Sequence, residues 1–161
     1  MTFLSRSFSL ALAGASLMVA GCATSQPQVQ TDDGAPLARQ ISQSSHCGLT
    51  APGHVLLESA ADVDRLESLQ GRTLPLAPLR AVDFDREHVV LAALGQKPTG
   101  GFSVTLVSSA ISDNTLELFV RIREPKPGTM VTQALTTPCA AIAVTAAGWS
   151  DILITPEQNN R

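Results

Sequence analysis

From Leu37 onward, short runs of apolar residues alternate with turn-forming residues along the chain. A loose alternation of apolar and polar side chains predicts a strand over residues 39–46, and an apolar run predicts another over residues 54–58. Residues 88–94 continue as an apolar run after His88, which is typical of a strand buried on both faces. The chain up to residue 94 therefore predicts at least three strands.

Residues 102–109 and 115–123 predict a β-hairpin, because two strand-like runs flank the turn-forming Ser112-Asp113-Asn114. Every other residue of the second run is apolar, so one face of that strand carries Leu116, Leu118, Val120 and Ile122. Residues 139–145 predict a further strand, and residues 152–154 predict one that closes the sheet. Between them, residues 130–135 fit a short helix.

One segment has the pattern of an amphipathic helix. Ser59 is placed as its N-cap and Asp62 follows three residues later, which is close to a capping box. Apolar residues then recur at helical spacing up to Gly71, at Val63, Leu66 and Leu69. Pro75 and Pro78 predict an irregular connection after this helix.

These elements together predict one α+β domain over residues 37–156, with a short tail at residues 157–161. The domain is expected to be mainly an antiparallel β-sheet or sandwich with one N-terminal helix. Tyr is absent, and the chain has five Phe and one Trp, so Val, Leu, Ile and Ala must supply most of the core. This amount of apolar material suits one small domain.

The N-terminal residues resemble a bacterial lipoprotein signal. An apolar run over residues 8–20 follows Arg6 and ends at Gly21-Cys22, with small residues at the expected cleavage site. The resemblance implies a signal peptide over residues 1–21 and lipid attachment, including palmitate, at Cys22. An ordinary secretory peptide, with no role for Cys22, is the alternative. Ala23 after the cysteine resembles the sorting pattern of outer-membrane lipoproteins, which implies an outer-membrane anchor facing the periplasm.

Residues 22–36 are rich in Gln, Thr, Asp and Pro and nearly free of apolar side chains, so they predict a disordered tether. Such a tether would hold the domain about 20 Å from the bilayer. The formal net charge is −3, and no basic cluster is visible, which argues against a nucleic-acid partner. The predicted partners are the bilayer, through the acyl anchor, and another envelope protein. The sequence does not predict an oligomeric state.

Export to an oxidising compartment favours disulfides, and lipidation of Cys22 leaves Cys47 and Cys139 as a pair. A bond between them would close a loop of about ninety residues and contribute about 4 kcal/mol in the chain-entropy model. A zinc site formed by His46, Cys47, His88 and Cys139 is an alternative, although no C-x-x-C or H-x-x-x-H spacing supports it. Two free, buried thiols are the remaining alternative.

Motifs for catalysis are missing from the sequence. It contains no G-x-S-x-G elbow, no H-E-x-x-H pair and no phosphate-binding glycine loop. The three histidines, His46, His54 and His88, fit strand edges or core positions better than a site. We therefore predict no catalytic residue, no metal ligand and no cofactor other than the lipid on Cys22.

Both lysines of the chain, Lys97 and Lys126, lie in loops rich in proline and glycine. One interpretation is that Pro and Gly only set the turn geometry, with Gly100 or Gly101 at positive φ, and that lysine keeps each loop solvated. The other is that two stiffened loops gather at one end of a sheet and present a binding edge. The predicted contact residues are Lys97, Pro98, Thr99, Gly100, Gly101, Phe102, Lys126, Pro127 and Gly128.

These loops carry a family resemblance that spans residues 84–145. The first motif is Leu94-Gly95-Gln96-Lys97-Pro98-Thr99-Gly100-Gly101-Phe102-Ser103-Val104, and the second runs from Glu124-Pro125-Lys126-Pro127-Gly128 to Thr136-Thr137-Pro138. In this order, with a hairpin between them, they resemble the C-terminal domain of the protease-complex-subunit PrcB family. The resemblance implies a surface lipoprotein that binds, stabilises or localises a protease and is not itself the protease.

A second resemblance concerns the first loop alone. The run Lys97-Pro98-Thr99-Gly100-Gly101-Phe102 is similar to the Asn-Pro-Thr-Thr-Gly-Tyr loop of chagasin-type cysteine protease inhibitors. Such inhibitors insert rigid loops into an active-site cleft, which limits the ordering entropy lost on binding. An inhibitor of this type, or a structural lipoprotein without a specific partner, is therefore the alternative function.

Overall fold

The computed structural model describes residues 36–70 and 72–157. The predicted signal peptide, the lipidation site at Cys22 and almost all of the predicted tether lie outside these residues. The described chain runs through β1 (Ala38–Ser44), β2 (Pro52–Leu57), α1 (Ala60–Leu66), α2 (Ala77–Arg80), β3 (Glu87–Leu94), β4 (Ser103–Ser112), β5 (Thr115–Arg123), β6 (Cys139–Thr145) and β7 (Asp151–Pro156). No described helix has the length and apolar character needed to cross a membrane.

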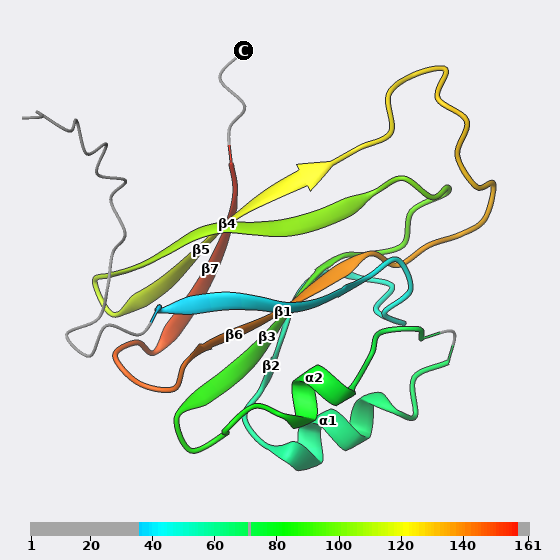
Figure 1. Cartoon of the computed structure of the whole chain (residues 1–161). Coiled ribbons are helices and arrows are strands. Elements are labelled where there is room, and N and C mark those ends of the chain that lie inside the picture. The colour runs from blue at the N-terminus through cyan, green and yellow to red at the C-terminus, as the bar shows by residue number, and fades with distance from the viewer. Residues whose placement is uncertain (1–35, 71, 158–161) are drawn as a thin grey trace, which may run out of the picture.

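Two β-sheets and two short helices form three layers (Figure 1). The first sheet has the strand order β1-β6-β3-β2, and the second has the order β4-β5-β7. The helices cover the face of the first sheet that points away from the second, so the β-rich fold predicted from the sequence is confirmed. The sheets are mainly antiparallel, as predicted, and one strand pair differs, because β7 pairs with β5 in parallel. The chain reaches β7 from β6 in the other sheet, so no hairpin forces β7 to run against β5.

The central strand β3 is buried on both faces, as its apolar run predicted. It lies between β2 and β6. Val89 and Leu91 pack in the cluster beneath the helices, whereas Val90 and Ala92 pack in the cluster between the two sheets. Alternate side chains of one strand thus supply both cores.

The predicted hairpin is formed by β4 and β5. Asp113 and Asn114 at its tip have φ values of 48° and 64°, the two positive φ angles that a type I′ turn requires. Of the apolar face predicted for β5, Leu116, Leu118 and Val120 are buried, but Ile122 stays 39% exposed. The end of this strand therefore reaches a less covered part of the molecule.

The helices differ from the predictions. Ser59 caps α1 as predicted, but α1 ends at Leu66, well before Gly71. Arg72 donates from Nε to the carbonyl oxygen of Leu66 at 3.0 Å, which satisfies a terminal carbonyl of the helix. The stretch around Pro78, predicted as irregular, forms α2, because proline is well suited to the first turn of a helix. The segment between β2 and β3 thus contains two short helices where one was predicted.

No helix forms over residues 130–135. The Thr132 carbonyl accepts a hydrogen bond from the Gly100 amide of the other loop, and Met130 and Leu135 are 99% and 63% exposed. A helix in this segment would have no apolar surface to pack against, and short helices are not stable alone.

Candidate protein-binding loops

The two loops that carry the lysines lie side by side. Lys97 and Thr136 exchange backbone hydrogen bonds of 2.8 and 3.0 Å, and the Gly100 amide donates to the Thr132 carbonyl at 2.9 Å. The Thr136 hydroxyl also donates to the Thr99 carbonyl at 2.8 Å, and Thr136 is the one buried polar residue in the part of the chain that the structure describes. We call residues 97–102 together with residues 124–136 the paired-loop surface. Its second loop extends past the ends of the strands as a long arch (Figure 1).

Glycine is needed where the two loops come close. Gly101 has a φ of 88°, and a Cβ atom added there would lie 3.0 Å from Val131 Cγ1 and 3.1 Å from Pro125 Cβ. A larger residue would therefore be strained and would push the loops apart. Gly128 also has a positive φ of 78°, but nothing lies within 4 Å of its added Cβ. Of the predicted pair Gly100 and Gly101, only Gly101 has the positive φ.

The two lysines have different surroundings. Lys97 is half-buried, and its Nζ lies 5.4 Å from the centre of the Phe102 ring, within the range of a cation–π interaction. Lys126 is exposed in a turn that is closed by a hydrogen bond from the Thr129 amide to the Lys126 carbonyl. Neither ammonium group forms an ion pair in the part of the chain that the structure describes. The surface therefore offers one oriented and one free positive charge.

Two apolar residues of this surface were not predicted as contacts. Met130 and Leu135 lie on the second loop, and both side chains are largely exposed. The sequence pattern placed them in a short helix and not among the contact residues. The sequence feature that could have marked them as contacts is the presence of large apolar residues in a proline-rich loop, where no neighbouring strand or helix pattern predicts their burial.

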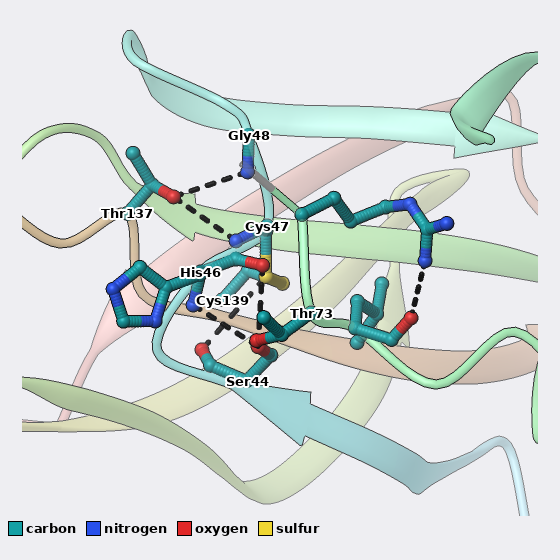
Figure 2. Close-up of a disulfide and its surroundings, with 9 residues drawn as sticks. Ser44, His46, Cys47, Gly48, Thr73, Thr137 and Cys139 are labelled. Atoms are coloured by element: carbon teal, nitrogen blue, oxygen red, sulfur yellow. Dashed lines mark hydrogen bonds between the residues drawn. A yellow bond between two sulfur atoms is a disulfide. The ribbon is translucent and has the colours of Figure 1, made fainter. Parts of the chain in front are cut away.

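A disulfide joins Cys47 to Cys139 at the base of the second loop (Figure 2). Next to it, the Thr137 hydroxyl accepts hydrogen bonds of 3.0 Å from the amides of both Cys47 and Gly48. The Thr137 amide donates to the Ser45 carbonyl at 2.8 Å. The end of the second loop is therefore fixed covalently and by hydrogen bonds to the segment after β1.

The histidines are not gathered into a site. His46 lies beside the disulfide, but the cysteine sulfurs are bonded to each other, so they do not offer thiolates to zinc. Within the described residues, no group of three or more His, Cys, Asp or Glu side chains is arranged to hold a metal. His88 stands edge-on to the Trp149 ring at 6.4 Å, and its Nδ1 is buried without a hydrogen-bond partner.

With this geometry in place, comparison with known proteins gives one match. Residues 88–145 match the family model described as PrcB C-terminal. This segment is similar to PrcB C-terminal domains. It runs from β3 to β6 and contains both loops, so all nine predicted contact residues lie inside it. The resemblance found in the sequence is thereby confirmed for these residues. Searches of curated proteins and of solved structures returned no match.

Proposed function

We propose that this protein is a non-catalytic, protein-binding subunit of the bacterial envelope, whose paired-loop surface contacts another protein, and that this partner is a protease. The observation that carries the proposal is the backbone pairing between Lys97 and Thr136 inside the PrcB segment. It joins two proline- and glycine-rich loops into one continuous surface. The family supports the choice of a protease-associated role.

The paired loops suit binding because they are ordered before a partner arrives. Backbone hydrogen bonds, the close contact at Gly101 and the nearby disulfide all restrict the loops. A surface that is already ordered loses less conformational entropy on association. Met130 and Leu135 offer exposed apolar area, while the two lysines attract an acidic partner and orient its approach.

The proposal also places the protein at a membrane. Cys22 would carry the acyl chains, and residues 22–36 would serve as the tether of the domain at the periplasmic face of the outer membrane. At a reach of about 20 Å, the tether would let the paired-loop surface meet a partner in the same membrane.

The proposal is tested by crosslinking and co-purifying partners from membranes with the lipidated, full-length protein. The parent is compared with the double variant Lys97→Glu, Lys126→Glu and with the charge-preserving control Lys97→Arg, Lys126→Arg. We expect the parent and the arginine control to retain the same protease and the glutamate variant to lose it. If all three proteins retain the same partners, the lysines are not part of an interface and the proposal fails.

A chagasin-like inhibitor is the second candidate, because the loop that resembles those inhibitors is held rigidly beside another loop. An inhibition assay with papain and the full-length protein separates the two functions. Dose-dependent inhibition that is lost on Gly101→Ala would favour the inhibitor. No inhibition, together with retention of a protease from membranes, would favour the binding subunit. Unchanged behaviour of every loop variant would favour a structural lipoprotein.

A further inference from the structure

The two sheets are closed on one side of the sandwich and open on the other. On the closed side, Gln40 Oε1 of β1 accepts a hydrogen bond of 2.9 Å from the Leu106 amide of β4. On the open side lie β2 and β7, each of which pairs with only one other described strand. A cleft of about 520 Å³ separates these two edge strands. Its volume falls within the range of about 300–1,000 Å³ that is usual for ligand sites.

This cleft between β2 and β7, which we call the inner cleft, is lined mainly by apolar side chains and by one lysine. Its walls include Leu94, Val120, Ile122, Ile152 and Leu153. Two of these side chains remain well exposed, Ile122 at 39% and Leu153 at 49%, so the cleft is not filled by the protein itself. Lys97 also lines it, which connects the cleft to the paired-loop surface. An apolar ligand that carries a carboxylate would match this lining.

A second cavity, of about 310 Å³, lies on the other face of the first sheet. Leu49 and Ala93 line it, and both are partly buried side chains that pack against the core on the helix side. Pro52, Gly53 and His54 of β2 line both cavities. The first half of β2 is therefore flanked by open space on both faces of the sheet.

Edge strands are normally protected from pairing with other chains by charged residues, bulges or proline. β2 reads Pro-Gly-His-Val-Leu-Leu and carries no Lys, Arg, Asp or Glu. Pro52 protects only its first position, and residues 52–55 are exposed. By contrast, β7 begins with Asp151 and ends with Pro156. Of the two strands that border the cleft, β2 is thus the one open to strand addition.

We propose that the free edge of β2 binds an extended segment of the partner protein as an added β-strand. The proposal rests on the function proposed above and names a second contact for the same partner. Side chains of an added strand would point alternately to the two faces of the sheet. One set of side chains would enter the inner cleft, and the other set would enter the second cavity, on the other face of the sheet. The segment would therefore be apolar at successive positions and would carry an Asp or Glu placed to meet Lys97.

The test uses random peptides of about ten residues, displayed on phage and selected on the full-length protein in phospholipid nanodiscs. The affinities of selected peptides are then measured for three proteins. Val55→Lys puts a charge on the β2 edge, where the valine is 37% exposed. Val107→Lys is the matched control on β4, where the valine is 39% exposed. Leu153→Lys alters the opposite wall of the cleft. Because it leaves β2 unchanged, a loss of binding in this variant cannot be caused by misfolding of β2 itself.

We expect selected peptides to be rich in apolar residues with at least one carboxylate, and to bind the parent. Val55→Lys and Leu153→Lys should each weaken binding by about tenfold or more, since a charge would be desolvated, and Val107→Lys should not. Bound peptide should slow amide hydrogen exchange in residues 53–57 and leave β4 unchanged. Methylating alternate backbone nitrogens of the peptide should abolish binding, because strand addition needs those donors.

Other outcomes overturn the proposal. Peptides that bind all variants equally, or no selected peptide at all, would show that the β2 edge takes no strand. A dimer that protects β2 without peptide would assign the edge to a second copy of the chain. Binding of a fatty acid to the parent protein, without protection of β2, would make the cleft a lipid site. If the Lys97→Glu, Lys126→Glu variant loses the protease but no selected peptide depends on β2, only this inference fails. If peptides bind at β2 but the Lys97→Glu, Lys126→Glu variant retains all of its partners, the proposed function fails and β2 remains as a separate binding edge.

Discussion

At the scale of single residues, Gly101 joins the two loops, and its conformation explains why. Its positive φ and its close contacts with Pro125 and Val131 each disfavour a Cβ atom. We predict that Gly101→Ala lowers the free energy of unfolding by about 1–2 kcal/mol and weakens partner retention. Gly128→Ala is the matched control, because it has the same backbone strain without the contact. Urea denaturation measures the free energy of unfolding of both variants, and equal losses would show that the contact of Gly101 with the other loop is unimportant.

Asp62 at the start of α1 makes a pH-dependent contribution. Its pKa is lowered from the ordinary value of 3.8, chiefly because the Ser59 hydroxyl donates to its carboxylate, with the Glu58 amide and Arg65 adding to the effect. The carboxylate therefore stabilises the fold above pH 3.8, and this stability is lost as the pH falls through the lowered value. We predict that Asp62→Asn lowers the melting temperature at pH 7.

The difference between parent and Asp62→Asn should disappear in acid, once the parent carboxylate is protonated. Thermal denaturation over a series of pH values measures it. Asp85→Asn serves as the control, since Asp85 is exposed and forms no ion pair in the described residues. A difference for Asp62→Asn that stays constant down to the lowest pH would contradict an ionic cause.

At the scale of elements, the predictions succeeded where the local pattern alone decides the structure. The predicted bounds of β6 agree with the structure, and the turn at Asp113 and Asn114 lies where turn chemistry placed it. The helices were predicted less well, because their ends depend on distant partners. Arg72 caps the end of α1 from outside the helix, and the periodicity of apolar residues does not predict that contact.

The disulfide acts at this scale by fixing the second loop to the segment after β1. We predict that Cys47→Ala with Cys139→Ala lowers the free energy of unfolding by about 4 kcal/mol, because the bond spans 92 residues. Amide exchange should rise most in residues 132–137, next to the lost bond, and less at the β4–β5 hairpin. Reducing the parent protein should give the same pattern. A uniform rise in exchange would show that the bond supports the whole fold and not this loop in particular.

At the scale of the whole molecule, the composition of both loops was visible in the sequence, but their contact was not. Lys97 meets Thr136 only because β3 and β6 are neighbours in the first sheet and the pairing continues past their ends. Likewise, β7 was predicted as a strand, yet its assignment to the second sheet depends on long-range packing. The cleft beside β2 arises from the same cause, since it exists only where two edge strands fail to meet.

The closed side of the sandwich, where β1 meets β4, provides a test of why the two sheets meet on this side and stay apart at β2 and β7. Register shifts occur in β1 between Gln40 and Ser42 and in β4 between Leu106 and Ser108, where the Gln40 side chain accepts the Leu106 amide. We predict that Gln40→Ala costs about 1–3 kcal/mol, because it leaves a partly buried amide without an acceptor. Gln40→Glu, which keeps an oxygen there, should recover most of the loss.

Gln43→Ala is the matched control, since Gln43 is exposed on the same strand and should change stability by less than about 0.5 kcal/mol. Urea denaturation gives these values, and amide exchange at Leu106 reports the lost bond directly. Peptide and partner binding should remain unchanged, because both proposed contacts lie away from this side. Equal effects of Gln40→Ala and Gln43→Ala would mean that the sandwich is held closed by apolar packing alone, and that the open side at β2 and β7 has another cause.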